Sequence, residues 1–153
     1  DETIGAALAQ GQLDMGADVI FGVGGIMGNG AIKKAAEQDA WAVGVDVDVY
    51  FTAFEGGTVT GADKVLTSVL KKVDNAMYNT ILDQVNGTFT SGTVVQNIAN
   101  DGVGLAIYHG PAGTIPDTVL NRINTVSAGI ADGSIDVWEP YWKHFVYLPA
   151  IVR

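Results

Sequence analysis

The chain has 153 residues, a formal net charge of −9, 48% hydrophobic residues and 16% charged residues. This length fits one domain with a substantial core, and this composition excludes a disordered chain. The negative charge argues against nucleic-acid binding, because phosphates would be repelled. The absence of cysteine excludes disulfides, thiolate catalysis and cysteine metal sites. No apolar run approaches the roughly 20 residues that span a bilayer. Since the first residue is Asp1 and not Met, we expect the chain to begin inside a longer precursor.

The first third of the chain predicts a helix, a strand, a glycine-rich turn and a second helix. Apolar residues at helical spacing predict the first helix over residues 3–15, and Asp18–Val23 is an apolar run typical of a strand covered on both faces. Five glycines lie between Gly22 and Gly30, and good helix formers follow from Ala31. This order places bare backbone at the carboxyl end of a strand, where ligands bind in open α/β sheets.

The middle of the chain continues the alternation. Ala40–Val45 predicts a second strand, the Gly- and Thr-rich residues 50–63 predict a loop, and residues 64–66 predict a brief strand. Thr67 or Ser68 would then cap a long helix that ends near residue 85. Alternating strands and helices favour an α/β fold with a mainly parallel sheet flanked by helices.

The last third predicts short strands and one long helix. Residues 93–98 are prone to form a strand, residues 103–108 predict a short apolar strand, and residues 117–131 predict an amphipathic helix. We therefore predict an α/β lobe over residues 1–134, followed by a C-terminal tail over residues 135–153 that has no assignable structure. The aromatic residues of this tail favour packing or an interface; they are Trp138, Tyr141, Trp142, Phe145 and Tyr147.

The glycine-rich turn matches neither common phosphate-binding pattern. No Lys-Ser or Lys-Thr pair follows Gly30, and Gly22-x-Gly24 is followed three residues later by Met27, where a dinucleotide site needs glycine. Two interpretations stay open. The segment is either a tight turn without a ligand, or Gly24 and Gly25 let a ligand reach backbone N–H groups near a helix N-terminus.

Charged residues follow the second and third predicted strands. Asp46 and Asp48 either share one face and accept hydrogen bonds from ligand hydroxyls, or cap a turn, with Asp48 released into the loop. A metal pair is a weaker idea, since no third ligand lies at informative spacing. Lys71 and Lys72 lie near the start of the long predicted helix, against its dipole, which indicates either a functional role or a solvated face.

Nothing in the chain indicates catalysis. His109 and His144 accompany no Ser or Cys nucleophile in a recognisable turn, and the phosphate motifs fail. We therefore expect no enzymatic activity, cofactor or metal, and a nucleotide-using enzyme is disfavoured.

Four segments in series resemble the basic membrane protein family of substrate-binding lipoproteins, which includes purine-nucleoside receptors. The resemblance runs from about Gly5 to Gly133, and its segments are QLDMGADVIFGVGGIMGNGAIKKAAE, AVGVDVD, VLTSVLKKVDNAMY and NDGVGLAIY. Such proteins are similar to type I periplasmic binding proteins, whose two α/β lobes close over a small ligand and deliver it to an ABC importer. The resemblance implies an extracytoplasmic protein anchored by a lipid on an N-terminal segment outside this chain.

The resemblance also implies the site residues. In such proteins the second lobe contributes a glycine of the turn, an Asp that binds ribose and a Lys, which correspond here to Gly24 or Gly25, Asp46 and Lys71. Lys71 would offset the charge of Asp46 in a dry cleft. The implied ligand is a purine nucleoside, and the implied partners are the membrane subunits of an ABC importer.

The chain departs from the family at three places. Val49 stands where the family often has Gln, Ile26 and Met27 make the turn more apolar, and the first lobe is absent. We therefore expect a C-terminal part of a solute-binding protein, in which residues 65–85 pack with the missing lobe. The alternative is a stand-alone α/β interaction module without a small ligand, in which the unpaired cleft face and the aromatic tail form an oligomer interface by contact or domain swapping.

Overall fold

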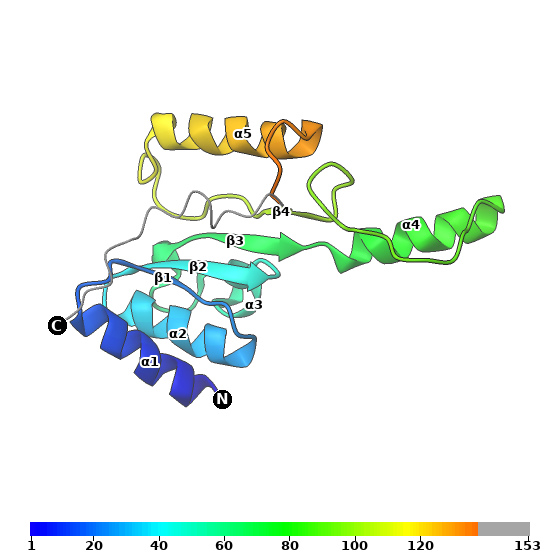
Figure 1. The fold of residues 1–153 in the computed structure, drawn as a ribbon. Coiled ribbons are helices and arrows are strands. Elements are labelled where there is room, and N and C mark those ends of the chain that lie inside the picture. The colour runs from blue at the N-terminus through cyan, green and yellow to red at the C-terminus, as the bar shows by residue number, and fades with distance from the viewer. Residues whose placement is uncertain (138–153) are drawn as a thin grey trace. The chain divides into compact units, whose positions relative to one another are not determined.

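The computed structural model describes residues 1–137 and divides the chain into a first unit, Asp1–Ile115, and a second unit that begins at Pro116. Figure 1 traces the elements of the first unit. In chain order they are α1 (Glu2–Asp14), β1 (Val19–Phe21), α2 (Ile26–Glu37), β2 (Trp41–Asp46), α3 (Val49–Thr52), β3 (Val65–Lys71), α4 (Val73–Asn86) and β4 (Val103–Leu105).

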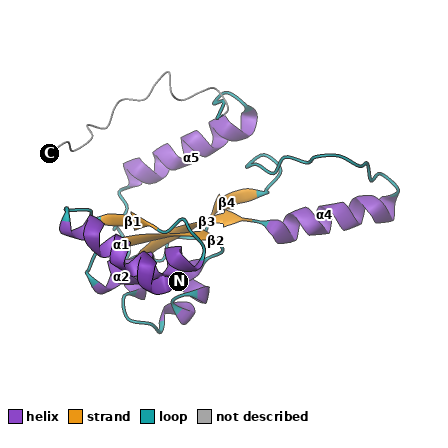
Figure 2. Ribbon diagram, turned by 60° about the horizontal axis from the view of Figure 1, so that its bottom comes forward, coloured by secondary structure: helices purple, strands orange, loops and turns teal. Residues whose placement is uncertain are grey.

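The first unit is built on a four-stranded sheet in the order β1-β2-β3-β4 (Figure 2). The strands β1, β2 and β3 run parallel, and β4 pairs antiparallel with β3. The predicted α/β fold with a mainly parallel sheet is confirmed. Because parallel strands end at the same edge, the residues that follow Phe21, Asp46 and Lys71 lie along one edge of the sheet.

Helices α1, α2 and α3 lie on one face of this sheet (Figure 1). Helix α1 packs on α2, and α2 packs on β1 and β2. One buried cluster centres on Ile32, Val49, Phe54 and Val65, between α2, α3 and the sheet. The prediction that β1 is covered on both faces is wrong within this chain, since its central residue Ile20 is buried while Val19 and Phe21 are exposed.

Residues 50–63 are more ordered than the predicted loop. They contain most of the short helix α3 and two 3₁₀ turns, Glu55–Gly57 and the start of Ala62–Lys64. The side chain of Phe54 is completely buried in the core cluster. Spacing analysis missed this segment because its buried residues follow neither helical nor strand periodicity.

The long helix predicted from residue 67 begins later. Residues Val65–Lys71 form the complete strand β3, and the helix α4 covers only Val73–Asn86. Strand β3 pairs with β2 on one side and with β4 on the other. The hydrogen bonds and packing of these two pairings stabilise a strand here, although the four-residue apolar period predicted a helix. Ser68 is therefore not a helix cap. The helix ends as predicted, with Gly87 in the left-handed region at φ 71°.

Two further predictions concern the segment after α4. Residues 93–98 form no strand, since residues 93–97 have no regular secondary structure and a turn begins at residue 98. The predicted strand at 103–108 is confirmed for Val103–Leu105 and ends there. Helix α4 itself buries none of its residues.

The second unit contains the helix α5, Asp117–Asp132, which confirms the helix predicted over residues 117–131. It begins after Pro116 and ends at Gly133, whose φ of 78° suits a C-terminal glycine. The tail aromatic residues and His144 lie outside the described residues, and the predicted boundary at residue 134 stays a prediction. None of the helices described is both long enough and apolar enough to cross a membrane.

Candidate functional site

The glycine-rich turn connects the carboxyl end of β1 to helix α2. Gly24 and Gly25 have φ values of 152° and 56°, which favour glycine at both positions. Gly25 is the N-cap residue of α2, and no side chain caps the helix there. The Met27 N–H donates to the Gly24 carbonyl at 3.2 Å, so the Ile26 and Gly28 amides are the ones that an external acceptor could reach. The helix dipole favours negative charge at this end.

Asp46 and Lys71 end the neighbouring strands β2 and β3. The Lys71 Nζ lies 3.1 Å from the Asp46 Oδ1, and the two side chains are 63% and 50% exposed. An ion pair that is half open to water adds little to stability. It does hold a carboxylate at the sheet edge with one oxygen paired to a cation, and lone pairs on both oxygens are left for other donors.

The structure brings together the two charged residues predicted for the site and places the two glycines at the same edge. Strand order sets this arrangement, because β2 lies between β1 and β3. The position of Lys71 differs from the sequence analysis in one respect. It ends a strand and does not lie within the first turns of a helix, so opposition to a helix dipole no longer applies to it.

An open hollow of about 680 Å³ lies beside the Asp46–Lys71 pair. Lys72, Asn75 and Asp101 line it as well and form a polar cluster. Lys72 forms an ion pair with Asp101, and the Asn75 Nδ2 donates to the Asp101 Oδ2 at 2.7 Å. The hydrogen bond from Lys72 lowers the pKa of the Asp101 carboxyl below its usual value. Sequence analysis missed this cluster, although the Asn100-Asp101-Gly102 turn was a visible signal.

Asp48 has the structural role that the sequence left open. Its Oδ1 accepts a hydrogen bond from the Tyr50 N–H at 3.2 Å, so it caps α3 after the chain leaves β2. Its Oδ2 lies 2.8 Å from the His109 Nε2, and the His109 side chain is only 6% exposed. His109 thus has a packed carboxylate partner, in a contact between residues 61 positions apart.

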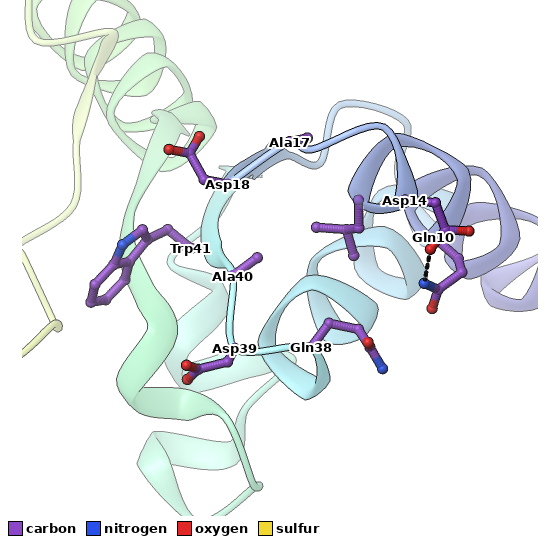
Figure 3. Close-up of a pocket in the computed structure, with 9 residues that line it drawn as sticks. Gln10, Asp14, Ala17, Asp18, Gln38, Asp39, Ala40 and Trp41 are labelled. Atoms are coloured by element: carbon purple, nitrogen blue, oxygen red, sulfur yellow. Dashed lines mark hydrogen bonds between the residues drawn. The ribbon is translucent and has the colours of Figure 1, made fainter.

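A second hollow, of about 350 Å³, lies at the opposite edge of the sheet (Figure 3). Although it contains several polar groups, Figure 3 shows the Asp18, Asp39 and Trp41 side chains pointing away from the hydrogen-bonded Gln10–Asp14 pair. Polar groups that point apart cannot all bind one ligand. This hollow also lies at the amino ends of the strands, whereas open α/β sheets bind ligands at the carboxyl ends. Within residues 1–137, no three acidic, His or Cys side chains gather closely enough to hold a metal ion.

A mainly parallel sheet with an open carboxyl edge is an arrangement in which α/β proteins bind small ligands. A family model described as "ABC transporter substrate-binding protein PnrA-like" matches residues 1–127. The chain therefore belongs to this family, the Bmp family of ABC transporter solute-binding proteins, and the predicted resemblance is confirmed.

Solved structures agree with this fold. A chain described as a transcriptional activator of the comK gene from Bacillus halodurans is 19% identical, with a TM-score of 0.71 over 84% of this chain and 42% of its own. A solute-binding protein of an ABC transporter system from Aeropyrum pernix is 25% identical, with a TM-score of 0.64 over 89% of this chain and 44% of its own. One from Conexibacter woesei is 20% identical, with a TM-score of 0.62 over 86% and 41%. The chain thus spans less than half the length of these structures.

Proposed function

We propose that this chain forms one wall of a nucleoside-binding cleft in an ABC-transporter solute-binding protein, with a purine nucleoside as ligand. The observation that carries the proposal is the Asp46–Lys71 ion pair at the carboxyl edge of the sheet, beside the uncapped start of α2. Asp46, Lys71, Gly24 and Gly25 are the proposed contacts. The proposed role of these contacts is binding alone, without catalysis.

The proposed chemistry is recognition of two neighbouring ribose hydroxyls. The Asp46 carboxylate has two oxygens and can accept a hydrogen bond from each hydroxyl. Lys71 offsets its charge, so that the carboxylate stays ionised when the cleft closes and excludes water. A ligand that lacks one hydroxyl would leave an acceptor unpaired, at a cost of about 1–3 kcal/mol.

The proposed cleft needs a second wall. Asp46 and Lys71 are half exposed here, and small-molecule sites bury most of their ligand. We therefore assign the other wall to a first lobe that precedes this chain, in what we call the two-lobed protein. In this proposal the two-lobed protein lies outside the cytoplasm, carries a lipid anchor and delivers its ligand to the membrane subunits of an ABC importer.

Calorimetric titration with adenosine, guanosine and inosine tests the proposal. We expect the two-lobed protein to bind at least one of them tightly, and the 153-residue chain alone to bind weakly or not at all. Tight binding by the chain alone would contradict the need for a second wall. No binding of any nucleoside by the two-lobed protein would contradict the ligand class.

Helix α4 supports the two-lobed arrangement and also favours a second candidate function. It buries none of its residues, and apolar side chains along it are more than half exposed. These side chains are Val73, Met77, Tyr78, Ile81 and Val85. We assign this face to the first lobe, and the alternative is a homo-oligomer of a stand-alone module that pairs through it.

Light scattering separates the two candidates. The substitution Ile81→Glu places a charge on the exposed α4 face, and Glu55→Gln is a control on the first unit away from this helix. If α4 pairs with a second copy, the chain alone is oligomeric and Ile81→Glu makes it monomeric. If the first lobe covers α4, the two-lobed protein is monomeric in light scattering. Ile81→Glu then lowers its free energy of unfolding in urea, and the control Glu55→Gln does not.

A further inference from the structure

Asp46 has a backbone conformation that residues other than glycine rarely adopt. Its φ is 71°, and the Val47 N–H donates to the Val45 carbonyl at 2.9 Å, which closes a three-residue turn around it. A γ-turn with positive φ at its centre is rare and strained. Strain of this kind persists only where the surrounding structure over-determines it, and it gathers at functional sites.

The chain on either side of this turn is fixed. Before the turn, Asp46 is paired with Leu70 in the β2–β3 ladder. After the turn, the Val49 N–H donates to the buried Ser68 Oγ at 3.0 Å. The Val49 side chain covers the backbone of Gly44, where an added Cβ would clash with it. The chain therefore has to reverse between Asp46 and Val49 and lie back on its own strand.

The Asp48 side chain supplies the remaining anchor. Its Oδ1 caps α3, and its Oδ2 accepts a hydrogen bond from the His109 Nε2–H at 2.8 Å. The imidazole stacks on the Tyr50 ring with the centroids 3.9 Å apart and the planes 2° from parallel. The His109 backbone N–H donates to the Leu66 carbonyl at 3.0 Å, which ties the histidine to β3.

We infer that His109 and Asp48 are positioning residues for ligand recognition by Asp46, a role that rests on the proposed function. Only Val47 lies between Asp46 and the anchored Asp48. The His109–Asp48 hydrogen bond therefore limits the backbone angles that Asp46 can adopt, and these angles set the direction of its carboxylate. To accept one hydrogen bond from each of two neighbouring hydroxyls, the carboxylate has to be held within roughly 0.5 Å in position and roughly 10–20° in direction.

Two substitutions separate the hydrogen bond from the ring packing. His109→Phe keeps a ring that can stack on Tyr50 and removes the donor to Asp48. His109→Gln loses the ring and keeps an N–H donor at a similar distance from the backbone. Glu2→Gln serves as a matched control, because it weakens a carboxylate contact elsewhere in the first unit, with Lys33, at the start of α1.

The first measurement needs no ligand and uses the 153-residue chain. We expect the ¹⁵N order parameters of the Asp46 and Val47 amides to stay near about 0.85 in the wild type, His109→Gln and Glu2→Gln, and to fall below about 0.6 in His109→Phe. Order parameters in α2 should stay unchanged in every variant. Unchanged values for Asp46 and Val47 in His109→Phe would overturn the inference.

The second measurement uses the two-lobed protein with adenosine and 2′,3′-dideoxyadenosine as probes. We expect His109→Phe to weaken adenosine binding by about tenfold or more and to leave dideoxyadenosine binding unchanged, because that ligand has no hydroxyls for Asp46. Equal losses for both probes would show a merely structural role and overturn the inference. If the wild type binds neither probe, the proposed function fails, and the order parameters still decide whether His109 positions the turn.

Discussion

The Lys71 ammonium lies 3.1 Å from the Asp46 carboxylate, and the two residues end adjacent parallel strands. Their side chains are half exposed, so the pair contributes at most about 1 kcal/mol to the stability of the chain. The main effect of the contact is therefore to hold a paired carboxylate at the edge of the sheet, and its contribution to the stability of the fold is small.

The first prediction follows from this exposure. Lys71→Met should change the free energy of unfolding of the 153-residue chain by less than about 1 kcal/mol in urea. In the two-lobed protein the same substitution should weaken nucleoside binding, because Asp46 would enter a closed cleft without its counter-charge. A large loss of stability in the chain alone would contradict this division between folding and binding.

Gly44 should not tolerate a side chain. An added Cβ would lie 2.7 Å from the Ser68 Oγ and against the methyl groups of Val49. We expect Gly44→Ala to lower the free energy of unfolding by about 1–3 kcal/mol, as overpacking does. Gly11→Ala is the matched control, because nothing lies near that position in α1 and alanine favours helix by about 0.5–1 kcal/mol. Equal effects of the two substitutions in urea unfolding would contradict the close contact.

Ser68 should be needed for the turn behind Asp46. Its buried Oγ accepts the hydrogen bond from the Val49 N–H, so Ser68→Ala leaves a buried donor unpaired. The expected loss in unfolding free energy is about 1–3 kcal/mol. Ser91→Ala, at an exposed position, should change it by less than about 0.5 kcal/mol. A Ser68→Ala variant as stable as the Ser91→Ala variant would show that another group satisfies the Val49 N–H.

The Lys72–Asp101 pair predicts a pH effect. The hydrogen bond from Lys72 lowers the pKa of the Asp101 carboxyl from its usual 3.8. A lowered folded-state pKa means that the stabilising contribution is complete above the unfolded value and is lost as the pH falls through the folded value. An NMR titration should give a midpoint for Asp101 below 3.8. Lys72→Met should move it toward 3.8, whereas Lys33→Met should not. A wild-type midpoint at or above 3.8 would contradict the pairing.

The sequence allowed good prediction where local pattern and tertiary environment agree. The run before the glycine turn, Ala40–Val45 and the helix over 117–131 each have the periodicity or apolar content of the element they form. Val69 continues the four-residue period of α4, yet it pairs with β2 and β4 as part of β3. That pairing depends on partners distant in sequence, which no local period reveals.

Some residues of the candidate site could be predicted from the sequence, and others could not. Asp46 could be placed at the carboxyl edge of the sheet from the apolar strand before it, whereas Lys71 could be assigned to the site only from the resemblance, because local pattern predicted a helix there. The Asp48–His109 contact could not be predicted, because it joins residues 61 positions apart across the sheet. The positive φ of Asp46 was hidden for a related reason, since it results from anchors supplied by Ser68 and His109.

In our proposal the Asp46 carboxylate binds a nucleoside through its ribose hydroxyls. Calorimetric titration of the two-lobed protein with its preferred nucleoside, for the wild type and for Asp46→Asn, measures this contact. Asparagine keeps the size of the side chain and removes the charge and one acceptor, so we expect the affinity to fall by at least about 100-fold. An Asp46→Asn protein that binds the nucleoside as tightly as the wild type would contradict it.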